Sequence, residues 1–313
     1  MYQGVVDTAL LRRSVIAVPP LCLNAELRPA PAEMKRLHDH LTAGGVTSIL
    51  YGGNAAFYHV GVADYGAILD AIEESAPADA WMIPSIGPDF GRMMDQAAIL
   101  STRAFPTAMV LPVARPFPFT EDGVVDGIRR AAARFGRPLT VYLKNEAALC
   151  PASVAALLRE GTAAAIKYAI DRPDPADDAF LDALLDAVGS ADRIVSGMGE
   201  RPVIAQWGKG LRGFTSGSVS IAPALSTAFK AALEAGRPDE ADAIWQRLRP
   251  LEDLRDEISQ IRVLHEAVDQ AGIAATGPML PLLSRLGAAD AARVRDVAKA
   301  LLSANHPTAQ AAE

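Results

Sequence analysis

Lys167 is the residue of this chain with the clearest capacity for chemistry. It is one of only six lysines among 313 residues, and it lies inside the apolar run 163–170. Burial among apolar groups disfavours a charged amine and lowers its pKa, which leaves a neutral amine able to attack a carbonyl carbon. The alternative is a lysine at a strand end whose stem is buried while its ammonium group reaches solvent or a carboxylate.

Tyr142, in the run Val141-Tyr142-Leu143, is the second candidate. A phenol can both donate and accept a hydrogen bond, so this side chain could carry protons beside the amine. A tyrosine that packs in a core and bonds a backbone carbonyl is the alternative.

A glycine-rich turn, Gly52-Gly53-Asn54, could present backbone N–H groups to a substrate carboxylate. It could equally be a tight turn that uses glycine for its conformational freedom. The segment 213–218, Gly-Phe-Thr-Ser-Gly-Ser, also allows two interpretations. Its carbonyls and hydroxyls could line a substrate site, or it could be a loop without a functional role. The phosphate-binding pattern GxxxxGK[ST] is absent from the chain.

Two charged residues, Glu200 and Arg115, complete the set of candidates. Either could bind substrate, although charges in such positions are more often solvated at a rim.

The elements that must position these residues alternate regularly. Short runs rich in Val, Ile and Leu alternate with segments of helical period such as 32–43 and 124–135, which is typical of βα units with a parallel sheet. Thr120-Glu121-Asp122 is a helix-start signal, and Gly44-Gly45 is a helix-stop signal. The eight strand-like runs are 14–18, 48–51, 82–86, 108–111, 139–143, 164–168, 193–195 and 213–216.

This alternation predicts an α/β fold of the (β/α)8 TIM-barrel type. Active sites of such barrels lie at the C-terminal ends of the strands, and this rule selects the glycine turn, Tyr142, Lys167, the segment 197–200 and the segment 213–220. Further helical patterns at 222–235, 240–249, 251–271 and 288–303 exceed what the last unit needs. We therefore expect a barrel over residues 1–235 and a C-terminal helical extension over 236–313, packed on the barrel.

The composition limits the classes of partner that the protein is expected to bind. Half of the residues are hydrophobic and 21% are charged; the pI is near 5.3, and no basic tract indicates a nucleic-acid partner. The sequence has no signal-peptide layout and no apolar run long enough to span a membrane, which predicts a cytoplasmic protein. The two cysteines are far apart, and His38 and His40 lie in a helical pattern, so no metal site is expected.

Several pieces of this sequence resemble the dihydrodipicolinate synthase and N-acetylneuraminate lyase superfamily, in the expected order and over residues 14–302. They are the run 41–50 before the glycine turn, Val141-Tyr142, Ile166-Lys167, Ser196-Gly197, and the segment 213–218 leading to Pro223 and the helix that ends at 232–236.

The resemblance implies a mechanism without a metal or organic cofactor. In this family a lysine, here Lys167, condenses with a 2-oxo acid, and the resulting iminium acts as the electron sink. Tyr142 matches the family's proton-shuttling tyrosine, and Gly53-Asn54 falls where the substrate carboxylate is bound. Thr215 falls where a backbone carbonyl lines the site. Family members are commonly homotetramers, which implies a homo-oligomer, dimer or tetramer, here.

The sequence also departs from the family pattern. The usual Gly-Thr-Thr-Gly-Glu turn reads Gly-Gly-Asn-Ala-Ala at 52–56, so the hydroxyls that bond the carboxylate and relay protons are missing, although Asn54 could donate an amide hydrogen bond. No tyrosine stands near Val113-Ala114, where the synthases lend one across a subunit interface. The stretch 145–148, which replaces the arginine for their second substrate, carries no positive charge.

These departures argue against true dihydrodipicolinate synthase activity. They favour instead an aldolase or dehydratase that acts on pyruvate or a 2-keto-3-deoxy sugar acid. The alternative is a barrel that has lost turnover and binds a 2-oxo acid as a sensor or regulatory protein.

Overall fold

The strands of the computed structural model, which describes residues 1–113 and 118–305, form one parallel sheet in the order β3-β2-β1-β9-β8-β7-β6-β5-β4. They are β1 (Ile16–Ala17), β2 (Ser48–Leu50), β3 (Trp81–Ile83), β4 (Ser85–Ile86), β5 (Met109–Val110), β6 (Leu139–Leu143), β7 (Ala163–Tyr168), β8 (Ile194–Ser196) and β9 (Gly213–Ser216).

Pro84 interrupts one strand and so divides it into β3 and β4. The first half pairs with β2 and the second half pairs with β5, so the interrupted strand closes the sheet into a ring. The expected (β/α)8 barrel is thus confirmed, with the predicted run 82–86 present as two short pieces. A proline lacks the backbone N–H that a ladder requires, which explains the interruption.

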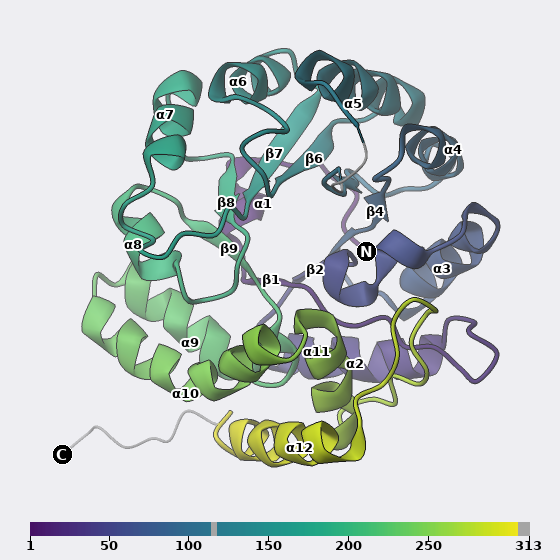
Figure 1. The fold of residues 1–313 in the computed structure, drawn as a ribbon, viewed down its shortest axis with the longest axis vertical. Helices are drawn as coiled ribbons and strands as arrows, with labels where there is room; N and C mark the ends of the chain where they lie inside the picture. The colour runs from purple at the N-terminus through teal and green to yellow at the C-terminus, as the bar shows by residue number, and fades with distance from the viewer. Residues whose placement is uncertain (114–117, 306–313) are drawn as a thin grey trace.

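The helices that follow the strands surround the ring (Figure 1). Capping signals set their ends: the Thr120 hydroxyl accepts the Gly123 N–H at 3.2 Å, and Gly136 adopts the left-handed conformation after the same helix. These helices are α2 (Pro31–Ala43), α3 (Val62–Ser75), α4 (Phe90–Leu100), α5 (Glu121–Phe135), α6 (Pro151–Arg159), α7 (Ala179–Val188), α8 (Val203–Gly208) and α9 (Pro223–Glu234). A short helix, α1 (Thr8–Arg12), precedes β1.

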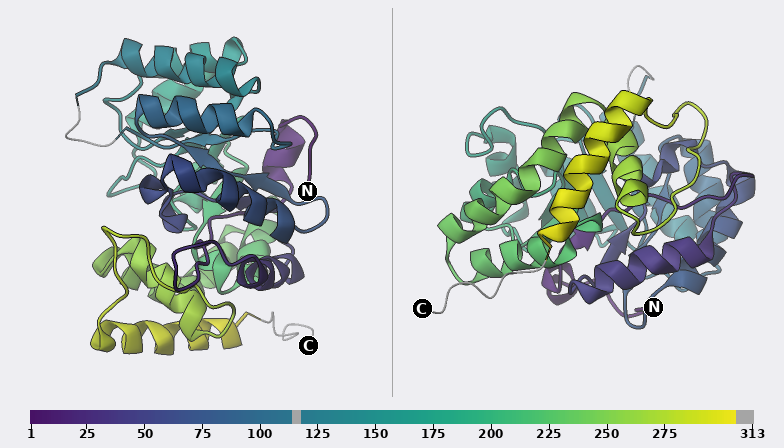
Figure 2. Two further views of the ribbon diagram at one scale, coloured as in Figure 1. Left: turned by 90° about the vertical axis from the view of Figure 1, so that its right-hand side faces the viewer. Right: turned by 90° about the horizontal axis from the view of Figure 1, so that it is seen from below.

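Three further helices lie together along one side of the barrel (Figures 1 and 2). They are α10 (Pro238–Glu257), α11 (Gln260–Gln270) and α12 (Ala288–Ser303). Helix α10 packs along α9, and α11 reaches the short 3-10 helix η1 (Gly53–Ala55) that follows β2. The C-terminal helices therefore approach one of the loops that carry candidate site residues.

The predicted boundary within these helices is wrong. Helix α10 runs through Pro250, and the break comes at Ile258 and Ser259, where Ser259 is fully extended. Leu248 and Leu251 on either side of the proline are buried, so packing holds the helix together across the position that lacks a donor.

In the described part of the chain, no helix is long and apolar enough to cross a membrane.

Candidate active site

Lys167 and Tyr142 stand opposite one another on adjacent strands. They are paired in the parallel register of β7 and β6, so their side chains leave the sheet on the same side. Lys167 is only 4% exposed. Its Nζ donates a hydrogen bond to the carbonyl oxygen of Gly197 at 2.9 Å and lies 3.7 Å from the centre of the Tyr142 ring. The structure thus brings together three residues selected from the sequence.

The environment of Lys167 disfavours its charge. Burial lowers the pKa of its amine well below 10.5, and the positive charges of Lys144 and Arg255 lower it further. None of the carboxylates in residues 1–113 and 118–305 forms an ion pair with Lys167. The amine is therefore held in the neutral, nucleophilic form to a much lower pH than that of an exposed lysine.

Tyr142 contributes a phenol that stays protonated. Burial, followed by the nearby Tyr58, raises the pKa of Tyr142, and the charge of Arg255 opposes that rise. Its side chain is partly buried and packed against the core. The phenol is an O–H donor at neutral pH, available beside the amine.

Gly197 must be glycine for the amine to sit where it does. A Cβ at this position would lie 2.6 Å from both Ala169 Cβ and Tyr168 O, and 3.0 Å from Lys167 Cγ. Its missing side chain lets the chain after β8 pass against β7, which brings the Gly197 carbonyl to the amine. Thr215 lines the same cavity, and its own carbonyl accepts the Gly199 N–H at 3.1 Å.

Several hydrogen bonds fix the turn after β2 in place. Asn54 Nδ2 donates to the carbonyl oxygen of Val18 at 2.8 Å, while Asn54 Oδ1 accepts from Arg255 Nη2 at 3.2 Å. The Asn54 carbonyl accepts from His265 Nε2 at 3.1 Å. Both ends of the Asn54 amide are thus engaged within the protein, which leaves one N–H of Nδ2 for a substrate.

The two glycines of this turn differ in position. Gly53 and Asn54 line the cavity at Lys167, whereas Gly52 is not among the lining residues. A Cβ on Gly52 would lie 2.7 Å from Leu50 Cδ2 and from Met109 Cε, so apolar side chains fill the space beside it. The predicted binding role of Gly52 has no support from its position.

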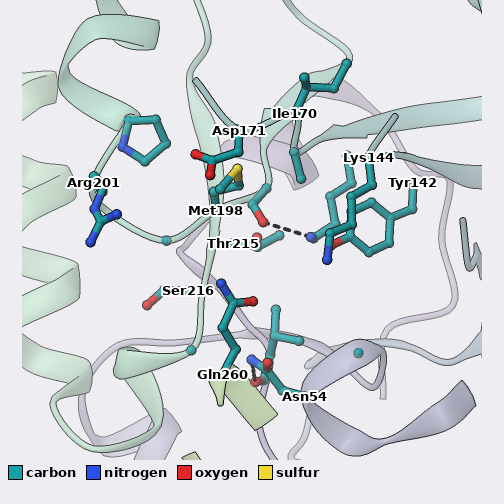
Figure 3. Close-up of a pocket in the computed structure, with 18 of the residues that line it drawn as sticks. Asn54, Tyr142, Lys144, Ile170, Asp171, Met198, Arg201, Thr215, Ser216 and Gln260 are labelled. Carbon is teal, nitrogen blue, oxygen red and sulfur yellow. Dashed lines mark hydrogen bonds between the residues drawn. The ribbon is translucent and has the colours of Figure 1, made fainter. Parts of the chain in front are cut away.

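These residues surround a cavity of about 560 Å³ at the C-terminal ends of the strands. Tyr142 and Lys144 project into it from one side, and Gln260 and Asn54 lie on another (Figure 3). Its wall is mixed, with apolar side chains next to charged groups. The apolar lining residues are Val18, Leu50, Met109, Ala169, Ile170, Pro175, Met198 and Pro202.

The sequence reasoning missed the basic residue Lys144, which precedes the stretch 145–148 and lines this cavity. Lys144 is two residues after Tyr142, and on a strand this spacing places two side chains on the same face. The sequence therefore contained a signal for Lys144.

It also missed four residues of the C-terminal helices: Glu252, Arg255, Asp256 and Gln260. Arg255 Nη1 contacts Glu252 Oε1 at 2.6 Å and Oε2 at 2.7 Å, and both side chains are buried. A Cβ on Gly217 would fall 2.6 Å from Arg255 Nη1, so a glycine after β9 gives the guanidinium its place. In sequence this pair looks like any exposed pair spaced three apart on a helix.

The expectation that Glu200 is a solvated rim charge is wrong. Its side chain is fully buried and accepts hydrogen bonds from Ser216 Oγ at 3.0 Å and Ser226 Oγ at 2.6 Å. Burial, with the nearby charge of Glu252, raises the pKa of Glu200 from 4.5 to about 7, against the lowering effect of the two hydroxyls. Arg115 and Ala114 lie outside the described residues.

Among known proteins, no family model matches the chain, and no curated protein sequence matches it either. Solved structures do match. Dihydrodipicolinate synthase from Oceanobacillus iheyensis is 20% identical with a TM-score of 0.78, and the match covers 94% of this chain and 97% of that one. N-acetylneuraminate lyase from Proteus mirabilis is 18% identical with a TM-score of 0.80 over 92% and 98% of the two chains.

A third match is YagE of E. coli K12, described as a member of the dihydrodipicolinic acid synthase family in complex with pyruvate. It is 19% identical with a TM-score of 0.76, over 92% of this chain and 98% of that chain. With near-complete coverage in both directions, the chain has the fold shared by the dihydrodipicolinate synthases and N-acetylneuraminate lyases.

Proposed function

We propose that this protein is a class I lyase, an aldolase or dehydratase, in which Lys167 forms a Schiff base with a 2-oxo acid. The observation that carries the proposal is a buried amine at the wall of a cavity, to which no carboxylate of residues 1–113 and 118–305 is paired. Such an amine has little structural value, because an unpaired buried ammonium group costs several kcal/mol. Its value lies in nucleophilic attack on a carbonyl carbon.

The positions of the side chains support the following first steps. The neutral Lys167 amine adds to the C2 carbonyl and forms a carbinolamine, whose hydroxyl group takes a proton and leaves as water. The product is a protonated Schiff base, an iminium. Tyr142, whose ring lies against Nζ, is the proposed source of the proton for the leaving hydroxyl.

The iminium then supplies the electron sink. For a 4-hydroxy-2-oxo acid, loss of the C4 hydroxyl proton and cleavage of the C3–C4 bond release an aldehyde, and the bonding electrons form an enamine on the lysine. Protonation of the enamine at C3 and hydrolysis of the iminium release the shortened 2-oxo acid and regenerate the amine. The same enamine can act in reverse, as the nucleophile of a condensation.

The chemistry and the fold support a 2-oxo acid as the substrate class. A 2-oxo acid supplies both the carbonyl for Lys167 and a carboxylate for the turn at Gly53 and Asn54. A structure with the same fold was solved with pyruvate, which supports pyruvate or a 2-keto-3-deoxy sugar acid as the substrate. The cavity of about 560 Å³ is large enough for the longer acids.

The test is intact-protein mass spectrometry after incubation with pyruvate and borohydride, which reduces a Schiff base to a stable adduct. We expect the pyruvyl adduct on the wild-type chain and on Lys35→Ala, a variant at an exposed lysine paired with Asp39. We expect none on Lys167→Ala.

Failure to trap pyruvate or any of a panel of 2-keto-3-deoxy sugar acids would contradict the proposal. If Lys167→Ala then still bound these acids as tightly as the wild type, the sensor or regulatory alternative would be favoured.

A further inference from the structure

Gln206 carries a buried amide that the protein itself does not bind. It lies in α8, is 4% exposed and lines the cavity at Lys167. Within residues 1–113 and 118–305, its Oε1 is fully enclosed and accepts no hydrogen bond. Its Nε2 donates none either, but it is not one of the fully enclosed atoms and so keeps accessible surface. A half-turn of the last torsion exchanges the two ends, so this amide can offer the cavity a donor or an acceptor.

A second buried glutamine shows what a structural role looks like in this fold. Gln96 is 1% exposed, and its Oε1 accepts the Gly87 N–H at 2.8 Å. Gln96 is not among the residues that line the cavity, whereas Gln206 is. An enclosed amide oxygen without a donor destabilises the folded state, so the Gln206 side chain is a cost to the fold and Gln96 is not. A partner for Gln206 must therefore come from the cavity that it borders.

The cavity wall next to Gln206 holds a positive charge that is already paired. The Gln206 N–H donates to the carbonyl oxygen of Pro202 at 3.0 Å, and Pro202 and the preceding Arg201 both line the cavity. The Arg201 guanidinium lies 2.7 Å from a carboxylate oxygen of Asp256 and 3.5 Å from one of Asp253. Since two carboxylates offset this charge, the wall at Gln206 has little attraction for a second anionic group of a substrate.

The same wall offers a further acceptor. Asp171 lines the cavity, and Figure 3 shows it with Arg201 on the side away from Tyr142. In the described ranges Asp171 forms no ion pair, because Arg172 and Arg201 bond other carboxylates. A carboxylate accepts hydrogen bonds from hydroxyl groups but repels a second carboxylate. This side of the cavity therefore suits a neutral tail that carries hydroxyl groups.

We propose that Gln206 binds hydroxyl groups on the tail of the 2-oxo acid and so selects a polyhydroxylated acid over one without hydroxyls, an inference that rests on the proposed function. The carbonyl carbon reacts with Lys167 while the tail extends along the cavity toward α8. A hydroxyl both donates and accepts, which matches an amide with two unbonded ends. A site that bonds substrate hydroxyls rejects the analogue without them, because its own polar groups then stay unpaired.

The experiment measures borohydride trapping by intact-protein mass spectrometry as a function of acid concentration, and it counts every adduct that an acid gives. The probes are 2-keto-3-deoxygluconate, pyruvate, and 2-oxohexanoate, which matches the sugar acid in chain length but has no hydroxyl groups on its tail. Gln206→Met replaces the amide with an apolar group of similar length. We expect it to raise the half-saturating concentration of 2-keto-3-deoxygluconate about 5- to 100-fold and to change that of the other two acids by less than about twofold.

The urea midpoint of the same variant separates a binding role from a structural one. Because Oε1 of Gln206 is enclosed without a donor, Gln206→Met should keep or raise the midpoint. Gln96→Met should lower it, since the Gly87 N–H loses its acceptor. Gln246→Met, a change at an exposed glutamine on α10, should match the wild type in both trapping and stability.

An unchanged half-saturating concentration of 2-keto-3-deoxygluconate in Gln206→Met would overturn the inference. An equal rise for 2-oxohexanoate would overturn it as well, because it would indicate a distorted cavity, and a lower urea midpoint would show that Gln206 serves the fold. A wild type that is trapped by pyruvate but not by 2-keto-3-deoxygluconate would also overturn it and leave the proposed function intact. An absent adduct on the wild type with all three acids would instead defeat the proposed function itself.

Discussion

The Lys167 amine rests against the Tyr142 ring, with Nζ 3.7 Å from the ring centre. An aromatic face attracts an ammonium group by about 0.5–2 kcal/mol, which favours the charged form. Burial of an unpaired charge costs several kcal/mol, which favours the neutral form. Burial is the larger effect, and the pKa of Lys167 lies well below its usual value. The ring therefore fixes the position of the amine and does not restore its charge.

Lys144→Met should raise the pKa of Lys167, because the ammonium group of Lys144 lowers it now. The pH dependence of the rate of trapping with pyruvate should then shift to higher pH. At pH values below the pKa of Lys167, the neutral fraction of its amine falls tenfold for each unit that this pKa rises. We therefore expect the rate of trapping to fall about two- to tenfold at the lower pH values.

The matched control for this change is Lys35→Met, which removes an exposed lysine on α2 and should leave the profile in place. A midpoint that stays fixed or moves to lower pH in Lys144→Met would contradict the electrostatic role of Lys144.

Gly197→Ala should destabilise the protein and displace the carbonyl that accepts from Lys167. The new Cβ would lie 2.6 Å from Ala169 Cβ and from a backbone oxygen, so strands β7 and β8 must shift. Overpacking of this kind costs about 1–3 kcal/mol, measurable as a lower urea midpoint. Trapping with pyruvate should also slow.

Gly208→Ala is the control for that substitution. Its Cβ would meet nothing within 4 Å at the end of α8, so we expect no loss of stability. Equal urea midpoints for the two variants would show that the close approach at Gly197 is not a constraint.

Most of the barrel could be predicted because its strands are short apolar runs buried on both faces. The predicted bounds of β6 and β9 coincide with the observed ones, and those of the other strands differ by a few residues. Pro84 inside the run 82–86 is the one visible warning of the interruption. The register that aligns Tyr142 with Lys167 also follows from strand ends that meet at one edge of a parallel sheet.

The contribution of the C-terminal helices to the site could not be predicted in the same way. Arg255 and Glu252 are spaced as an exposed helical ion pair, and only the packing of α10 against the barrel buries them. The burial of Glu200 depends on Ser216 and Ser226, hydroxyls that are remote from it in sequence. Periodicity reports which face of a helix is apolar, but not which charged residues a second layer of helices will cover.

Glu200 should make the free energy of unfolding decrease as pH rises. Its pKa is about 7 in the folded protein and near 4.5 when exposed, so between these pH values only the folded state holds the proton. The contribution to the free energy of unfolding is full below 4.5 and is lost as pH rises through 7, by about 1.4 kcal/mol per unit. Glu200→Gln, which resembles the protonated form, should lack this slope.

The measurement is the urea midpoint of wild type and Glu200→Gln between pH 5 and 8. The urea midpoint of Glu200→Gln should rise relative to that of the wild type as pH rises. The midpoint of Glu74→Gln, a change at an exposed carboxylate, should follow that of the wild type throughout. A constant difference between Glu200→Gln and the wild type would mean that Glu200 does not change protonation in this range.

Arg255 links the C-terminal helices to the site, so its removal should affect both stability and the proposed chemistry. Arg255→Met leaves the carboxylate of Glu252 buried without its partner, which typically costs about 3–5 kcal/mol. The same change releases Asn54 Oδ1, which now accepts from Arg255 Nη2 at 3.2 Å. We expect a lower urea midpoint and slower trapping with pyruvate.

The double variant Arg255→Met/Glu252→Met distinguishes the two effects. Removing both charges should restore most of the stability, because no buried charge is then left unpaired. It should not restore trapping, since Asn54 still lacks the donor that orients it and Lys167 still lacks the positive charge that lowers its pKa. If trapping recovered together with stability, Arg255 would serve the fold alone.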